Sequence, residues 1–332
     1  MRAELDPVEY EQAAASLCNG DTRSAEKVFA AVVEKGCSQS APAAFQCGLL
    51  ARCRIDFTRA MECLERAVAL DGNNPEYLRS AAVLARTLYD HKRALNWFAA
   101  LEKVLAEQGD DTVELALARR DLAYCVALVG RHKQAGALYK QAMVSLSNLV
   151  GKEDPEMGVC WFQIGKLQEA LGKYEKAEEP YRKALAILEQ AEGNVVVGDI
   201  LAKLAGLYME LEREMEAIPL FTRLCAFREA SPHPDKAALA MTCNNLAEAY
   251  RICGKYAEAE ENYRRSLAIT EELRGKDHAA VGSILQELAQ LCRRQGKEDE
   301  AQAHQERAAA IFQRVLDEQE AAGQEASVKI NL

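Results

Sequence analysis

The residues best suited to acid–base chemistry are two pairs of adjacent carboxylates, Glu178 with Glu179 and Asp299 with Glu300. A general acid and a general base must converge on one reacting bond, whereas adjacent side chains on a helix point in different directions. We therefore expect both pairs to lie on an exposed, hydrated helix surface. No serine or cysteine stands in a nucleophile motif with its required strand context. The sequence thus predicts a protein that is not an enzyme and uses no cofactor.

Eleven cysteines and five histidines could bind a metal or form disulfides. None of the cysteines forms a Cys-x-x-Cys pair, and the histidines are scattered, unlike the clustered ligands of a zinc site. Most of the cysteines occupy apolar positions, where a thiol behaves as a small hydrophobic group. Their odd number and placement predict reduced thiols, no bound metal and a cytoplasmic location.

A regular series of eight alanines, called here the alanine ladder, indicates which elements hold these residues. The ladder consists of Ala25, Ala60, Ala94, Ala135, Ala177, Ala217, Ala259 and Ala301, separated by 35, 34, 41, 42, 40, 42 and 42 residues. Such a period is typical of repeat architectures. Nearly the whole chain therefore consists of one repeated unit.

Each ladder alanine has a small residue twelve positions before it, and the first seven have a bulky residue four positions after it. The small residues are Ala13, Gly48, Ala82, Ala123, Gly165, Ala205, Ala247 and Ala289, and the bulky ones are Phe29, Leu64, Phe98, Tyr139, Tyr181, Phe221 and Tyr263. Small residues let two helices approach closely, and a large side chain further along the same face fills the space beside them. Each unit is thus predicted to be a helical hairpin.

Turn-forming residues fall where such a hairpin needs them, at Gly20, Asp56, Asp90, Gly130, Gly172, Gly254 and Gly296. Proline is nearly absent from the predicted helix interiors. Pro180 and Pro219 are expected within about the first turn of a second helix, where a missing N–H costs little.

The repeated pattern resembles a known family. Residues 41–74, with Gly48, Ala60, Ala67 and the closing Asp71-Gly-Asn-Asn74, resemble the tetratricopeptide repeat, a helix–turn–helix unit of about 34 residues. From about residue 75 the unit is longer, and segments such as Cys243-Asn-Asn-Leu-Ala-Glu-Ala-Tyr250 are similar to the repeats of kinesin light chain. The resemblance implies an all-α, right-handed α-solenoid of stacked helical hairpins.

The resemblance covers residues 6–316. The repeats are expected at 6–40, 41–74, 75–115, 116–157, 158–197, 198–239, 240–281 and 282–316, followed by the end of a capping helix and a mobile tail at 317–332. In the longer repeats, Gly151, Gly193 and Gly275 are expected to end an extended second helix with a left-handed cap.

Charge and hydropathy exclude several classes of partner. The formal net charge is −10, which disfavours nucleic acid and anionic membranes because phosphate contacts require a basic face. No stretch approaches the 18 or so consecutive apolar residues of a membrane span. The chain begins without a basic and then apolar signal region. We therefore expect a protein or peptide partner.

By the geometry of the resembled family, first helices line a binding groove with the residues that packing does not use. These residues are Arg79, Arg86, Arg120, Tyr124, Phe162, Lys166, Lys203, Asn244, Asn245, Glu248, Arg251, Gln286, Arg293 and Arg294. Basic groups can attract a carboxylate, and amides can pair with an extended backbone. These residues thus predict a short partner segment that carries Asp or Glu and an aromatic or Leu anchor, bound in the concave groove of residues 116–300.

The resemblance also has a departure. Kinesin light chain repeats place asparagine regularly on the groove face, whereas this chain has Asp121, Gln163, Lys203, Asn245 and Glu287 at that recurring position. This favours a non-enzymatic adaptor or scaffold over a kinesin subunit. Two alternatives stay open, namely a self-assembling structural repeat protein that forms homo-oligomers and a regulatory peptide sensor.

Overall fold

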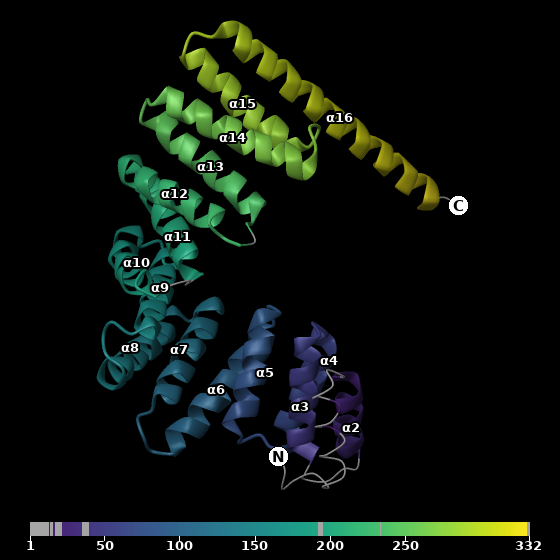
Figure 1. Cartoon of the computed structure of the whole chain (residues 1–332), viewed down its shortest axis with the longest axis vertical. Helices are drawn as coiled ribbons and strands as arrows, with labels where there is room; N and C mark the ends of the chain where they lie inside the picture. Colours follow the sequence, from purple (N-terminus) through teal and green to yellow (C-terminus); the bar gives the residue numbers. More distant parts are fainter. Residues whose placement is uncertain are drawn as a thin grey trace. The chain divides into compact units, whose positions relative to one another are not determined.

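The computed structural model describes Ala13, Ser16 and residues 22–34, 40–191, 195–232 and 234–330, with helical side chains described as far as Glu318. Among these residues every regular element is an α-helix (Figure 1). The predicted all-α fold of helical hairpins is therefore confirmed. Gly20 and Gly193 lie outside the described residues.

The chain divides into two compact units, Met1–Leu167 (unit 1) and Gln168–Leu332 (unit 2). The helices of unit 1 are α2 (Thr22–Glu34), α3 (Ser40–Cys53), α4 (Phe57–Leu70), α5 (Pro75–Thr87), α6 (His91–Glu107), α7 (Val113–Leu128), α8 (His132–Leu149) and most of α9 (Pro155–Ala170). Those of unit 2 are α10 (Tyr174–Leu188), α11 (Val196–Glu210), α12 (Glu214–Glu229), α13 (Lys236–Ile252), α14 (Tyr256–Arg274), α15 (Ala279–Arg294) and α16 (Glu298–Ile330). The odd-numbered helices from α3 to α15 are the first helices of their hairpins.

The alanine ladder lies in the core of the fold. All eight ladder alanines have no exposed surface, and the small residues twelve positions earlier are all buried. The bulky residues four positions later are at most 3% exposed. The spacing of small and bulky residues therefore predicted the buried faces correctly.

The turn between the two helices of a hairpin is a repeated left-handed cap. Gly130, Gly172, Gly254 and Gly296 have φ between 67° and 80°, and the next amide donates to a carbonyl five residues back, as from Lys173 to Gln168 at 2.9 Å. This is the bond pattern of the Schellman motif. The glycines predicted as turn residues thus have the φ that favours glycine.

Three repeats place a residue with a side chain at the same turn position. Ile55, Tyr89 and Glu212 have φ of 63°, 60° and 55°. Left-handed backbone costs a residue with a Cβ about 1–2 kcal/mol, and the cost is greatest for a β-branched side chain. Ile55 is 73% exposed, so its side chain gains little packing in return.

Replacing Ile55 by glycine is therefore expected to raise the free energy of unfolding by about 1 kcal/mol. Ile55→Ala is the control, because alanine keeps the Cβ and should change stability much less. Urea denaturation followed by circular dichroism measures both. A lower stability of the glycine variant would contradict the strain at this turn.

The prolines lie deeper in their helices than predicted. Pro180 and Pro219 stand inside α10 and α12, in the second turn, where an amide would normally donate to a carbonyl four residues earlier. The expectation that they fall within about the first turn, where a missing N–H costs little, was therefore wrong. Pro180 is buried, so packing of the ring offsets part of the lost bond.

The last helix extends beyond the predicted repeat. Ile311 is 3% exposed and packs with Val281, Leu285 and Ala308, as expected of a helix that covers the end of the stack. α16 continues to Ile330, through most of the segment expected as a tail. The mobility of this segment stays a prediction.

Candidate functional site

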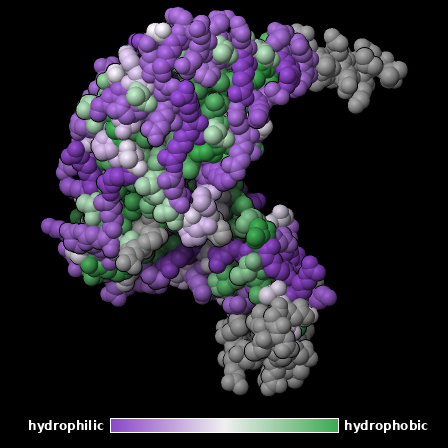
Figure 2. Space-filling model, turned by 45° about the horizontal axis from the view of Figure 1, so that its top comes forward, coloured by the Kyte–Doolittle hydropathy of each residue, from purple (hydrophilic) through white to green (hydrophobic). Residues whose placement is uncertain are grey.

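The groove residues predicted from the sequence all lie on first helices, between α5 and α15. Most of them are half-buried, whereas Asn245, Gln286, Arg293 and Arg294 are exposed. The surface visible in Figure 2 is mostly hydrophilic, with smaller hydrophobic areas among the polar side chains.

In unit 1 the predicted basic residues are held by carboxylates of the same chain. Asp121 is 9% exposed and accepts from Arg120 Nε at 3.1 Å while pairing with Arg86 Nη1 at 3.1 Å. Arg120 also pairs with Glu156. The two arginines thus meet two carboxylates within the fold, which limits the availability of their charges to a ligand.

The remaining predicted residues of unit 1 form a cation–aromatic contact and an exposed ion pair. Lys166 Nζ lies 5.3 Å from the ring centre of Tyr124 and 5.6 Å from that of Phe162. A cation within about 6 Å of a ring face is attracted by its negative charge density. Arg79 Nη1 lies 2.8 Å from Glu114 Oε1. These side chains are therefore positioned by neighbours and not free in solution.

In unit 2 the first helices carry two further internal ion pairs. Lys203 Nζ donates to Glu169 Oε1 at 2.8 Å. Arg251 Nε donates to Glu248 Oε2 at 2.7 Å, and Tyr263 Oη donates to the same oxygen at 2.8 Å. The Arg251 hydrogen bond lowers the pKa of the Glu248 carboxyl most strongly, and the Tyr263 bond lowers it further. Glu248 is thus ionised and engaged.

The other predicted residues of unit 2 are more available. Arg293 Nη2 donates to Gln305 Oε1 at 3.4 Å, which leaves its charge without a carboxylate among the described residues. Arg294 forms no ion pair within that part of the chain, and its charge lowers the pKa of Glu248 from a distance. The C-terminal end of α15 is therefore a basic, solvent-accessible surface.

A cleft of ≈ 380 Å³ opens between α13 and α15, beside α14. Its lining includes Met241, Asn244, Ser283, Ile284 and Glu287. Met241 is 60% exposed, so apolar surface is open to solvent beside an amide and a carboxylate. Such a mixture can hold an apolar side chain and fix its orientation with a few polar contacts.

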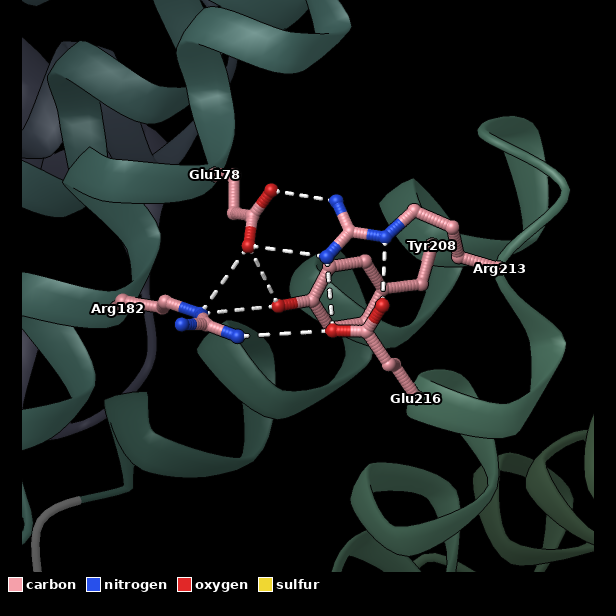
Figure 3. Close-up of polar contacts among 5 residues, drawn as sticks. All are labelled: Glu178, Arg182, Tyr208, Arg213 and Glu216. Carbon is pink, nitrogen blue, oxygen red and sulfur yellow. Dashed lines mark hydrogen bonds and ion pairs between the residues drawn. The ribbon is translucent and has the colours of Figure 1, made fainter.

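Glu178 is not on an exposed surface, contrary to the sequence interpretation. Its carboxylate accepts from Arg213 Nη1 at 2.7 Å and from Tyr208 Oη at 2.9 Å, as Figure 3 shows. The Arg213 guanidinium also bonds both oxygens of Glu216 at 2.7 Å and lies 4.6 Å from the Tyr208 ring centre. The network joins α10, α11 and α12. Glu179, by contrast, is exposed and pairs with Lys183.

The same arrangement recurs after other ladder alanines. Glu260 follows Ala259, is buried, and pairs with Arg264 and with Lys297 Nζ at 2.8 Å. Glu26 follows Ala25 and pairs with Arg54 and Arg59. A glutamate directly after a ladder alanine, with a basic residue at the next repeat's turn, was the sequence signal for these structural ion pairs.

Within the described residues, no group of three or more His, Cys, Asp or Glu side chains is placed to hold a metal ion. Nine cysteines in that part of the chain are free, and seven of them are buried. Across the described helices, none has the length and hydropathy of a membrane span.

Comparisons with known proteins agree with the repeat pattern. The tetratricopeptide repeat family matches residues 113–190 and 237–314. Kinesin light chain-related 3 of Arabidopsis thaliana is 24% identical over 224 residues, which are 64% of this chain and 34% of that protein. Human superkiller complex protein 3 is 28% identical over 163 residues, which are 49% of this chain and 10% of that protein. The chain thus spans about a third of the first relative and a tenth of the second.

Solved structures show the same fold at low sequence identity. The apo form of the quorum sensor NprR from B. thuringiensis has a TM-score of 0.63 and 14% identity, covering 93% of this chain and 89% of that one. BtubC (BKLC) from P. vanneervenii has a TM-score of 0.56 and 21% identity, covering 67% and 91%. Residues 113–190 and 237–314 therefore match tetratricopeptide repeats, and the solved structures share the fold of stacked helical hairpins with this chain.

Proposed function

We propose that this protein is a non-enzymatic scaffold that binds a short segment of a partner protein on the first helices of unit 2. The observation that carries the proposal is the combination on α13 and α15 of an open cleft, exposed amides at Asn245 and Gln286, and the basic end at Arg293 and Arg294. Fold alone does not assign a function, so the proposal rests on this surface.

Each part of the surface suits a different part of a peptide. An apolar side chain, Leu or aromatic, fits beside Met241 and Ile284 in the cleft. Asparagine and glutamine amides offer both donors and acceptors to an extended backbone. Arg293 and Arg294 attract an Asp or Glu of the segment, since neither has a carboxylate partner among the described residues. Free, mostly buried cysteines support a reducing, cytoplasmic setting.

Selection from a display library of random short peptides tests this function. We expect enriched peptides that contain Asp or Glu, bind with micromolar affinity and bind more weakly as salt is added. The double variant Arg293→Glu, Arg294→Glu should lower that affinity about tenfold or more, because a charge-assisted contact becomes a repulsion.

The matched control is Lys92→Glu with Lys133→Glu. These lysines are exposed in the first turns of second helices α6 and α8, so the control makes the same change in net charge away from the proposed surface. Affinity should stay near that of the wild type. If the arginine variant remains helical by circular dichroism and binds the selected peptides unchanged, the surface of α13 and α15 is not the binding site.

A further inference from the structure

Two pairs of neighbouring first helices are joined by an ion pair at the same positions of the repeat. One partner lies four residues after the small residue of a first helix, and the other lies two residues before the small residue of the next first helix. In unit 1 these partners are Arg86 and Asp121, at 3.1 Å. In unit 2 they are Glu169 and Lys203, at 2.8 Å. The charges are exchanged between the two cases, but the positions are the same.

The next pair of such positions in unit 2, Met209 and Asn245, is uncharged. The pair after it is Arg251 and Glu287, which carry opposite charges but do not form the ion pair. Arg251 turns to Glu248 on its own helix. The residue before Asp121 is Arg120, whose guanidinium is a second cation beside that carboxylate. The residue before Glu287 is Gln286, which carries no charge. As a result, Glu287 has neither a hydrogen bond nor an ion pair with any described residue.

The surroundings of Glu287 make this lack of a cation costly. The side chain is half-buried. Burial raises the pKa of the Glu287 carboxyl above its ordinary value, and the Glu248 carboxylate raises it further, although Arg251 lowers it. A carboxylate that is partly desolvated and has no hydrogen-bond or ion-pair partner is stabilised when a cation binds beside it.

The cleft around Glu287 suits the side chain of an arginine. Arg274 of α14 also lines this cleft, but it forms no hydrogen bond or ion pair with Glu287. Met241 and Ile284 supply apolar surface for its methylene groups, as long basic side chains commonly require. Asn244 lines the same cleft and offers an amide oxygen to an N–H that the carboxylate does not take. Arg86 and Arg120 show that guanidinium groups occupy the corresponding place at Asp121 in this chain.

We propose that Glu287 receives an arginine of the bound partner segment, which takes the place of the missing internal cation in the cleft between α13 and α15. This inference rests on the proposed function. The methylene groups of the arginine take the place of the Leu or aromatic anchor beside Met241 and Ile284, and Arg293 and Arg294 still bind an acidic residue of the segment. In unit 1, by contrast, the corresponding carboxylate, Asp121, is already neutralised by Arg86 and Arg120.

The test uses the full-length protein and the random peptide library. Selections on the wild type should enrich Arg, and the affinity of an enriched peptide should fall about tenfold or more with Glu287→Gln, the size expected for a charge-assisted contact. The Glu287→Asp variant, which keeps a carboxylate, should retain part of the wild-type affinity. Glu261→Gln, which removes an exposed carboxylate from α14, is the control and should leave affinity unchanged.

A double-mutant cycle ties the effect to one pair. Changing the enriched Arg of the peptide to Gln should weaken binding to the wild type as much as Glu287→Gln does, and the two changes together should cost little more than either alone. Additive effects would overturn the assignment. The assignment would also be overturned if the enriched peptides lack Arg but their affinity still depends on Arg293 and Arg294. If the Arg293→Glu, Arg294→Glu variant binds the peptides with unchanged affinity, the proposed function itself would be refuted.

The stability of the unbound protein provides a second measurement. Because Glu287 faces another carboxylate and no partner, Glu287→Gln should leave the denaturation midpoint unchanged or raise it. A clear fall would mean that Arg251 holds Glu287 in solution, and the inference would then be wrong.

Discussion

Replacing Phe98 by alanine is expected to lower the free energy of unfolding by about 3–5 kcal/mol, the usual cost of a large core cavity. Phe98 has no exposed surface and packs in the main core of unit 1 with Ala82, Ala94 and Leu101. It fills the space that small residues leave between two helices. Urea denaturation of wild type and variant, followed by circular dichroism, measures the difference.

A graded variant separates the cavity from the loss of an aromatic ring. Phe98→Leu keeps most of the volume and should cost less than about 1.5 kcal/mol. Leu128→Ala serves as a surface control, because Leu128 is 45% exposed. Similar losses for Phe98→Ala and Leu128→Ala would show that Phe98 is not a core residue in solution.

Glu178→Ala is expected to destabilise the protein by roughly 2 kcal/mol, within the range of hydrogen bonds to charged groups. The substitution leaves Arg213 and the Tyr208 hydroxyl without their shared acceptor, and both come from other helices than Glu178 (Figure 3). Glu179→Ala is the matched control. It removes an adjacent glutamate that is 74% exposed at its side chain, where ion pairs contribute little.

The contribution of Glu178 should also depend on pH. Hydrogen bonding from Arg213 lowers the pKa of the Glu178 carboxyl below its ordinary 4.5, with a further lowering by Tyr208, although burial opposes it. A carboxyl whose pKa is lowered on folding stabilises the protein above its unfolded-state pKa, and the stabilisation is lost as the pH falls through the folded-state pKa. The difference between wild type and Glu178→Gln should therefore shrink below about pH 4.5. A constant difference at acid pH would contradict the network.

The periodic part of the sequence predicted the packing well, because packing depends mainly on residue size and spacing. Ala82, Ala94 and Phe98 show the pattern, since all three are buried in one core where two helices pack closely. Turn glycines were predictable for a similar reason, as their φ is a local property. Ile55 was not, because a strained residue can be held in place by the hairpin around it.

Charged residues were harder to place from sequence. Glu178 and Glu179 are neighbours of the same type, yet one joins three helices and the other faces solvent. Their difference arises from Arg213, which belongs to another repeat and is brought near only by stacking. The same limit applies to the groove. The sequence pattern predicts both Arg251 and Arg294 as available basic residues, but Arg251 forms an ion pair with Glu248 on its own helix and Arg294 does not.

The strongest helix–helix contacts described in each unit join consecutive helices, such as α13 with α14 and α3 with α4. Contacts of this kind close short loops, so little chain entropy is lost before they form. A hairpin can therefore assemble soon after its second helix leaves the ribosome, without waiting for distant segments. Synthesis from the N-terminus then adds one hairpin at a time to a stack that already presents a matching face.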